Sequence, residues 1–290
     1  MTGLEQVYAL PIWVGAVQAV PLGGGITNVN FLVTDQVKRC VVRLGGDIPV
    51  HQVMRFNELA ASRAAHAAGI SPAVLHHQPG VLVLDYIEAR TLNAADLRDD
   101  AMLAQAIDLV ARCHRDMPRH LRGPALVFWV FHVLRDYAAT LRDGHSPHLP
   151  LLRDLMEQAA RLEAAVGPID LVFGHNDLLP ANFLHDGTRM WLIDWDYAGF
   201  NSPLFDLGGL AANVSLSLPQ ETRLLETYFD RTVDAALMHR YLATKAAAAL
   251  REALWSMVSE LHSALDFDFA AYTAANLATY RASYDAFLQS

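Results

Sequence analysis

The hydrophobic pattern of this chain changes near residue 86, and that change limits the folds open to it. Before residue 86, short runs rich in β-branched residues alternate with turn residues, which is typical of β-strands. After it, Ala and Leu recur at helical spacing over long stretches. The chain has 290 residues, 53% of them hydrophobic, so it can bury a substantial core. We expect a soluble α+β protein with a β-rich lobe at residues 1–86 and a larger, mainly helical lobe at residues 87–290.

The first lobe is predicted to hold a β-meander, one helix and a further strand pair. Gly-rich and polar segments separate the apolar runs, as the turns of a meander require. Strands are predicted at residues 16–22, 29–35, 39–45, 73–77 and 80–87. A helix is predicted at residues 53–70, because Ala is abundant there and Gly69 and Pro72 close the segment.

The second lobe is predicted to be built from long helices. Apolar residues recur at helical spacing in residues 92–117, 130–143, 149–166 and 235–265. The only strand-like segments in this lobe are residues 171–175 and 190–195. A polar loop lies between these two segments.

Charge, cysteine content and the N-terminal segment argue against several classes of protein. The net charge of −9 disfavours a nucleic-acid-binding protein, because phosphate contacts need clustered Lys and Arg side chains and no cluster appears. Cys40 and Cys113 each lie in an apolar run without a neighbouring Cys, so both are predicted to be buried free thiols of a cytoplasmic protein. Pro11 and Pro21 interrupt the apolar residues 7–25, which disfavours a signal peptide or a membrane span.

The polar loop of the second lobe, GHNDLLPANFL at residues 174–184, places a carboxylate and an amide five residues apart. Asp and Asn alone are common in turns, where they hydrogen-bond their own backbone. Asp177 and Asn182, however, have the interval of the protein-kinase catalytic loop, and Asp194 follows at the end of an apolar strand. Phosphoryl transfer needs a carboxylate near the attacking hydroxyl and oxygen ligands for magnesium. The ordered set therefore favours phosphoryl transfer over three independent turn residues.

A second carboxylate follows Asp194 closely. The strand at residues 190–193 is expected to return beside the loop and to bring Asp194 next to Asn182, so that both face one metal ion. Asp196 lies two residues further on, and it faces the same side as Asp194 if the strand persists. Two carboxylates on one side indicate a site for a hard cation. Either one alone fits a turn or a helix cap equally well.

Three segments, HNDLLPANFL, LIDWDYAGFNSPLFDLG and GGITN, together resemble the choline and ethanolamine kinase family, within the aminoglycoside phosphotransferase and protein-kinase-like superfamily. The resemblance runs from Gly23 to beyond Tyr280. It implies a protein-kinase-like two-lobed fold, with a small antiparallel β lobe and a helical lobe. It also implies ATP and Mg²⁺ as cofactors, with GTP as an alternative phosphate donor.

The resemblance assigns roles to the polar loop and its surroundings. It implies that Asp177 orients the acceptor hydroxyl and accepts its proton. The metal ligands that it implies, one of them directly or through water, are Asn182, Asp194 and Asp196. Structural roles are implied for His175, which braces the loop, and for Asp206, which anchors the loop from the next helix.

The nucleotide phosphates are expected to bind in the first lobe. The Gly-rich turn after the first strand lets backbone amides approach phosphate closely, although it lacks the three spaced glycines of protein kinases. The residues of this turn expected to bind the cofactor are Gly23, Gly24, Gly25, Thr27 and Asn28.

Arg43 stands in an otherwise apolar strand, where a protein kinase has Lys. The resemblance implies that it contacts the phosphates and that Glu58 fixes it by an ion pair, the alternative being a surface pair of little value. It also implies that backbone groups at Asp85 and Ile87 bind the adenine edge.

The acceptor is less well defined by the sequence. The resemblance implies that Trp255 and Phe269 surround an amine by cation–π attraction, but Glu252 stands where the family has a second Trp, which disfavours choline itself. Thiamine and aminoglycoside kinases are the alternatives, since fold does not fix the substrate, and a non-catalytic nucleotide-binding protein is another. The sequence does not determine the oligomeric state, a dimer being one option.

Overall fold

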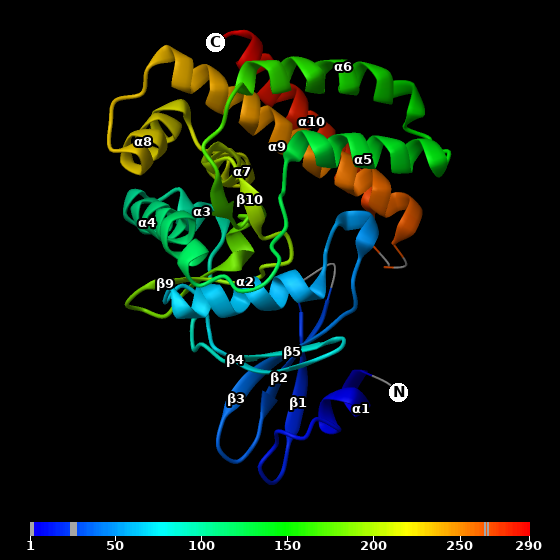
Figure 1. Cartoon of the computed structure of the whole chain (residues 1–290), viewed down its shortest axis with the longest axis vertical. Coiled ribbons are helices and arrows are strands. Elements are labelled where there is room, and N and C mark those ends of the chain that lie inside the picture. Colours follow the sequence, from blue (N-terminus) through cyan, green and yellow to red (C-terminus); the bar gives the residue numbers. More distant parts are fainter. Residues whose placement is uncertain (1–2, 24–27, 264, 266) are drawn as a thin grey trace.

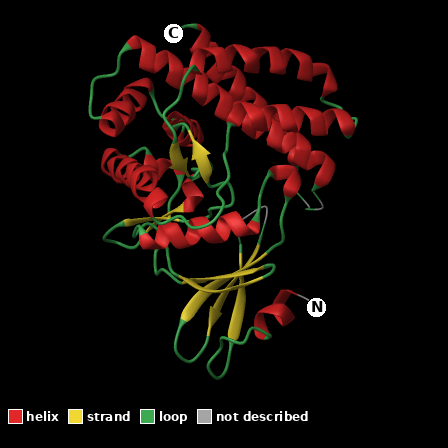
Figure 2. Cartoon of the chain, viewed as in Figure 1, coloured by secondary structure: helices red, strands yellow, loops and turns green. Residues whose placement is uncertain are grey.

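The computed structural model describes residues 3–23, 28–263, 265 and 267–290. A sheet with a short helix beside it forms one end of the molecule, and a bundle of helices forms the other (Figure 1). Coloured by secondary structure, the strands of the small lobe stand apart from the helical lobe (Figure 2). This is the predicted α+β, protein-kinase-like arrangement of a small antiparallel β lobe and a helical lobe, and the prediction is confirmed.

The small lobe is organised around one antiparallel sheet of five strands, in the order β1-β2-β3-β5-β4. The strands are β1 (Gln18–Leu22), β2 (Val29–Thr34), β3 (Arg39–Leu44), β4 (Val74–Gln78) and β5 (Val81–Asp85). One face of the sheet buries Val33, Cys40, Val42 and Val83 beneath α1 (Gly3–Tyr8). All five predicted strands are therefore present, and β3 lies at the centre of the sheet.

Helix α2 (Arg55–Ala67) runs across the molecule between the sheet and the helical lobe (Figure 1). A short 3-10 turn, η1 (Pro49–His51), precedes it. Ala61, Ala64 and Ala65 of α2 are fully buried and belong to the core of the helical lobe, so the helix joins the two lobes. Gly69 has φ of 71°, a left-handed conformation that glycine adopts without steric cost, and the predicted helix ends there.

The helical lobe is built around α9, which packs against α5, α6, α7 and α10. Its helices are α3 (Ala94–Leu97), α4 (Asp100–Asp116), α5 (Val130–Asp143), α6 (Leu149–Val166), α7 (Pro203–Val214), α8 (Leu218–Phe229), α9 (Ala235–His262) and α10 (Phe269–Leu288). The predicted helices at residues 130–143 and 149–166 coincide with α5 and α6. The segment at residues 92–117 divides into α3 and α4, because Asp99 caps the second helix with its side chain.

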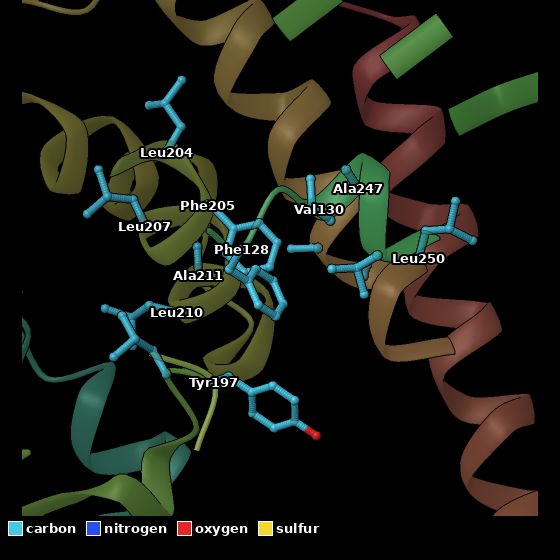
Figure 3. Close-up of a cluster of buried hydrophobic side chains, with 14 of the residues drawn as sticks. Phe128, Val130, Tyr197, Leu204, Phe205, Leu207, Leu210, Ala211, Ala247 and Leu250 are labelled. Carbon is cyan, nitrogen blue, oxygen red and sulfur yellow. The ribbon is translucent and has the colours of Figure 1, made fainter. Parts of the chain in front are cut away.

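Helices α7 and α9 approach each other closely. A Cβ atom on Gly208 of α7 would lie 2.9 Å from Cα of Lys245 on α9, so glycine is needed at that position. Phe128 and Phe205 fill the space between the two helices beside Ala247 (Figure 3). Tyr197 borders the same cluster, and its hydroxyl points away from it.

The helical lobe also holds short strands. They are β6 (Arg90–Thr91), β8 (Phe183–His185) and β9 (Met190–Leu192) in one small sheet, and β7 (Val172–Gly174) paired with β10 (Gly199–Asn201) in another. Two further 3-10 turns are η2 (Met117–Arg119) and η3 (Pro180–Asn182). Only the strands corresponding to β7 and β9 were expected, and β6, β8 and β10 were not predicted.

Three other expectations bear on the whole chain. The lobe boundary at residues 86 and 87 falls just after β5 and stays a prediction. Cys40 and Cys113 are free and buried, as expected, whereas the cytoplasmic location stays a prediction. Across the part of the chain that is described, no helix has the length and apolar character needed to span a membrane.

Candidate active site

The loop after β7 is held by its own backbone and by one carboxylate on α7. Asp206 accepts hydrogen bonds from the backbone N–H of His175 at 2.8 Å and of Asn176 at 2.7 Å. A Cβ atom on Gly174 would lie 2.9 Å from Oδ1 of Asn176 and 3.0 Å from the carboxylate of Asp206, so only glycine fits at this approach. Asn176 itself has φ of 64°. The chain is thereby turned sharply just before Asp177.

Asp206 is fixed in turn from α4. His114 Nε2 lies 2.9 Å from the Asp206 carboxylate, and His114 Nδ1 lies 2.7 Å from the hydroxyl of Tyr228. Burial alone would raise the pKa of Asp206, but the hydrogen bond from His114 lowers that pKa below its usual value. These contacts suit the loop-anchoring role expected for Asp206. His114 holds the Asp206 carboxylate in place, and no sign of this contact appears in the sequence.

His175 joins the loop to the segment that carries Asp194. Its Nδ1 atom accepts a hydrogen bond from the backbone N–H of Asp177 at 3.2 Å, and its Nε2 atom donates to the carbonyl of Ile193 at 2.9 Å. Burial lowers the pKa of His175, so the ring is neutral in this tautomer. These contacts fit the proposed bracing role and leave neither ring nitrogen for proton transfer.

Asp177 borders a cavity in the helical lobe. The helical-lobe cavity is lined by residues of the polar loop, α7, α9 and α10, including Asn176, Asp177, Asn213, Arg251, Glu252 and Thr279. Burial raises the pKa of Asp177 to about 8, while the Arg251 guanidinium opposes the rise and the Glu252 carboxylate adds to it. Nη1 of Arg251 lies 3.9 Å from Oδ1 of Asp177. The carboxylate is therefore in a setting where small changes of environment alter its protonation.

Asn182 and Asp194 lie next to each other, as the spacing predicted. The backbone N–H of Ile193 donates to the carbonyl of Asn182 at 3.0 Å, and the Asn182 side-chain amide donates to the carbonyl of Asp177 at 2.9 Å. Strand β9 ends at Leu192, and Asp194 has φ of 71°. Asp196 was expected to face the same side as Asp194 only if the strand continued through both residues, and the strand does not continue.

A cluster of charges joins the two lobes at this point. Arg43 on β3 contacts Glu58 at 3.3 Å, Asp194 at 2.9 Å and Asp196 at 3.1 Å. Burial alone would lower the pKa of Arg43, but the carboxylates of Asp194, Glu58 and Asp196 raise it, so the guanidinium stays charged. The predicted Arg43–Glu58 pair is thus a buried ion pair and not a surface pair.

Three donors of the described residues surround Asp196. Arg43 and Arg55 contact its Oδ1 atom, Arg55 at 2.8 Å, and the amide of Asn28 donates to Oδ2 at 3.0 Å. Burial would raise the pKa of Asp196, but the two arginines hold it below the usual value. Asp196 is 3% exposed, and its described contacts are those of an anchor for the arginines. Its assignment as a metal ligand remains a proposal.

A second cavity, the interlobe cavity, opens between the sheet and the polar loop. Among the residues that line it are seven that the sequence assigned to the cofactor or the metal: Gly23, Asn28, Arg43, Asp85, Ile87, Asn182 and Asp194. Gly24, Gly25 and Thr27 lie outside the described residues. Residues far apart in the sequence are thus brought to one cavity.

The two aromatic residues expected around the acceptor, Trp255 and Phe269, lie together but line a different cavity, with His51 and Ser259, and not the helical-lobe cavity that Asp177 borders. Trp255 lies 6.2 Å from Phe269 and 6.3 Å from Tyr272 between ring centroids, and its Nε1 atom donates to the hydroxyl of Tyr197 at 2.8 Å. Glu252 lines the helical-lobe cavity but is already engaged, because Arg251 donates to it at 2.9 Å and the hydroxyl of Tyr272 at 2.8 Å.

Sequence reasoning missed Arg55, Arg251 and Tyr197. Arg251 interrupts a long Ala- and Leu-rich helix, the same signal that identified Arg43 in its strand. Arg55 precedes Glu58 by one helical turn, at a spacing that favours an ion pair. Tyr197 carried no signal of its own, since its contacts are made with residues distant in the sequence.

The β lobe, the helical lobe and the Asp177, Asn182 and Asp194 set between them define a protein-kinase-like phosphotransferase class. The profile of the phosphotransferase enzyme family matches residues 18–250, and the chain belongs to that family.

Individual relatives refine the family. The chain is 30% identical over 214 residues to protein LicA of Haemophilus influenzae, a match that covers 72% of this chain and 62% of LicA. It is 27% identical over 285 residues to ethanolamine kinase 2 of Mus musculus, covering 88% of this chain and 73% of that protein. A choline/ethanolamine kinase family protein of Mesorhizobium loti has the same fold, with 29% identity, a TM-score of 0.77 and coverage of 96% of this chain and 92% of that one.

These relatives confirm the predicted resemblance to choline and ethanolamine kinases and the predicted class of small-molecule kinase. The matched region spans less than two thirds of the Haemophilus protein. The phosphate donor, the metal and the acceptor of this chain are therefore proposals.

Proposed function

We propose that this protein transfers the γ-phosphate of ATP, in a Mg²⁺-dependent reaction, to the hydroxyl of a small hydroxylated amine of the ethanolamine or choline type. One observation carries the proposal: Asp177 borders the helical-lobe cavity, while Asn182 and Asp194 border the adjoining interlobe cavity together with Arg43. A donor and an acceptor held in the two cavities would meet at the polar loop.

The interlobe cavity suits a nucleotide. Leu22, Val41, Leu84 and Ile193 give it apolar walls for a flat base, and Arg43 supplies a charged fork for phosphate oxygens. The backbone of residues 85–87 lies at the same cavity and offers hydrogen-bonding groups to the base edge. ATP and GTP differ at that edge, so the choice between them is left to measurement.

The oxygen atoms near the polar loop suit magnesium. The Asn182 side-chain nitrogen is bound to the carbonyl of Asp177, so its amide oxygen is the atom left for a cation, next to the Asp194 carboxylate. Within the described residues, no three His, Cys, Asp or Glu side chains form a metal-binding group. Mg²⁺ at kinase sites is commonly held by one or two protein ligands plus phosphate oxygens, and when bound it neutralises charge on the transferred phosphate.

Asp177 is the residue that we propose acts on the acceptor. The hydroxyl oxygen forms a bond to the γ-phosphorus, the bond from that phosphorus to ADP breaks, and the hydroxyl proton passes to the Asp177 carboxylate. His175 holds the backbone of Asp177 from one side, and Asp206 holds the two preceding N–H groups. The loop geometry is thereby set before any ligand arrives.

The preference for an amine rests on the relatives and on the aromatic residues. The mouse relative is named ethanolamine kinase 2, and Tyr272, which packs against Trp255 and binds Glu252 of the helical-lobe cavity, supplies an aromatic face beside that cavity. Thiamine, an aminoglycoside or no acceptor at all are the competing outcomes.

The test is a phosphate-transfer screen with purified protein. ATP or GTP with Mg²⁺ is offered together with ethanolamine, choline, thiamine or several aminoglycosides, and phosphorylated product is measured directly. We expect transfer from ATP to an amino alcohol, absent in Asp177→Asn and in EDTA. Transfer only to thiamine or an aminoglycoside would replace the acceptor, and nucleotide binding without any transfer would identify a non-catalytic protein.

A further inference from the structure

Arg251 occupies an unusual position for a site expected to receive an amine. It lies in the middle of α9, is 3% exposed, and lines the helical-lobe cavity together with Asp177. Its guanidinium carbon lies 4.3 Å from the ring centre of Tyr197 and 5.5 Å from that of Phe128. Aromatic faces that would attract a cationic ligand are thus already covered by a cation of the protein.

The hydrogen bonds of Arg251 are incomplete. Nη1 donates to Glu252 at 2.9 Å and lies 3.9 Å from Asp177. Nε and Nη2 are buried, and neither has a hydrogen-bond partner among the residues that the structure describes. Nε and Nη2 form one edge of the guanidinium, and such an edge binds a carboxylate through two parallel hydrogen bonds. Leaving buried charged donors unpaired is unfavourable, which indicates that a ligand group completes them.

Glu252 is balanced by this arginine. Its two oxygens accept from Arg251 and from Tyr272, so the carboxylate is not an isolated negative charge awaiting an ammonium. A carboxylate oxygen can nevertheless accept a second hydrogen bond. Arg251 and Glu252 therefore present a positive and a negative group side by side, and the complementary ligand is a zwitterion.

We propose that the phosphate acceptor is a small hydroxy amino acid, whose carboxylate binds Nε and Nη2 of Arg251 and whose ammonium lies near Glu252. The inference rests on the proposed function and narrows its acceptor from an amine to an amine that also carries a carboxylate. Arg251 and Asp177 line one cavity, with Nη1 of Arg251 3.9 Å from Oδ1 of Asp177, so the acceptor is expected to be short, with its carboxylate and hydroxyl a few bonds apart as in serine or homoserine.

The reaction is the same phosphate transfer as in the proposed function, with a different acceptor. The side-chain hydroxyl oxygen of the amino acid bonds to the γ-phosphorus of ATP, the bond from phosphorus to ADP breaks, and the proton passes to Asp177. The products are ADP and the phosphate monoester of the amino acid. No oxidant, reductant or further reactant is needed.

The test compares acceptors that differ by the carboxylate. kcat/KM is measured for L-serine, L-homoserine, ethanolamine and choline in the wild type, in Arg251→Met and in Arg251→Lys. We expect wild type to prefer a carboxylated acceptor, and Arg251→Met to lower the ratio of carboxylated to uncarboxylated kcat/KM about thirtyfold or more. Arg251→Lys should recover part of the ratio, since it keeps the charge and loses the two-point geometry.

The control is Arg240→Met, on the same helix but with its guanidinium on the backbone carbonyls of Val166 and Pro168. It should leave the ratio unchanged. If the Arg251 variants do not fold, the inference is judged from the ratio of kcat/KM for carboxylated and uncarboxylated acceptors in the wild type alone. A wild type that prefers ethanolamine or choline overturns the inference and leaves the proposed function intact, as does an unchanged ratio in a folded Arg251→Met. Failure to phosphorylate any acceptor, with ATP bound, removes the proposed function and the inference with it.

Discussion

Nη2 of Arg43 lies 2.9 Å from Oδ1 of Asp194, although the two residues are 151 positions apart in the sequence. This contact joins the central strand of the sheet to the segment proposed to bind the metal. Glu58 contacts Nε of the same guanidinium at 3.3 Å. Arg43 therefore stands between a fixed carboxylate and one that a bound metal would engage.

Arg43→Ala is expected to raise the KM for ATP and to lower kcat, because it removes the fork proposed to bind phosphate and leaves Glu58 and Asp196 with Arg55 as the one cation among their described contacts. Arg43→Lys should restore part of the activity, because charge survives without the bidentate geometry. Steady-state kinetics with varied ATP check both variants. Equal activity of Arg43→Ala and wild type would contradict the assignment.

Glu58→Ala should have a milder effect of the same kind, since it frees Arg43 without removing it. Because the two residues are in contact, the double variant should lose less than the sum of the single losses, with a coupling of about 0.5–3 kcal/mol. A double-mutant cycle on kcat/KM measures this coupling. Additive losses would indicate that the pair plays no joint role in the reaction.

Asp177→Asn is expected to lower kcat by about 10²-fold or more while nucleotide affinity stays within a few-fold, because the carboxylate acts on the hydroxyl and not on ATP. Asn keeps the size of the side chain and lacks the proton-accepting group. Nucleotide binding by calorimetry, beside the turnover assay, separates the two effects. Retention of most of kcat would remove Asp177 from the mechanism.

Asp194→Ala should behave differently from Asp177→Asn, because it removes a proposed metal ligand. We expect the Mg²⁺ concentration needed for half-maximal rate to rise, and the affinity for ATP in the presence of Mg²⁺ to fall. Magnesium titrations of the two variants, run in parallel, make the comparison. If Asp194→Ala has the same Mg²⁺ dependence as wild type, Asp194 is not a metal ligand and its role is limited to the ion pair with Arg43.

The sequence predicted those parts of the site that are encoded locally. Asp177 and Asn182 share one loop, and their interval, taken together with Asp194, is the basis of the roles proposed for them. Arg43 was found because a charge in an apolar strand needs a partner. Segments with strong periodicity, such as α5 and α6, were predicted to the residue.

Other parts depend on contacts that no local pattern encodes. Arg55 meets Asp196 across 141 positions of sequence, and Arg251 reaches Asp177 from a different element. Asp196 was expected to share one side of a strand with Asp194, which required the strand to continue. The strand stops at Leu192 and the backbone turns at Asp194, so this requirement is not met. Helices α7, α8 and α10 were not predicted from the hydrophobic pattern; in α10, Ala on the exposed faces blurs the apolar stripe.

His51 provides a test of the packing beneath the acceptor region. It is 6% exposed, its Nδ1 and Nε2 atoms lie 3.3 Å from the hydroxyl of Tyr137 and 3.1 Å from that of Ser259, and its ring lies 5.0 Å from Trp255. Burial lowers the pKa of His51 to about 3, with the positive charge of Arg251 adding to the effect. The folded protein therefore keeps this ring neutral at a pH where the unfolded chain takes up a proton.

Because the folded-state pKa of His51 is depressed, its neutral form supports the fold fully above pH 6.5, and that support falls as the pH drops toward 3. The loss approaches about 1.4 kcal/mol per pH unit below the unfolded-state pKa. His51→Gln cannot titrate, so the free energy of unfolding of wild type relative to this variant should fall by about 1.4 kcal/mol between pH 7.5 and pH 5.5. Urea unfolding of both proteins at the two pH values measures the difference. If the difference in free energy of unfolding between the two proteins does not change with pH, His51 is protonated in the folded protein as readily as in the unfolded chain.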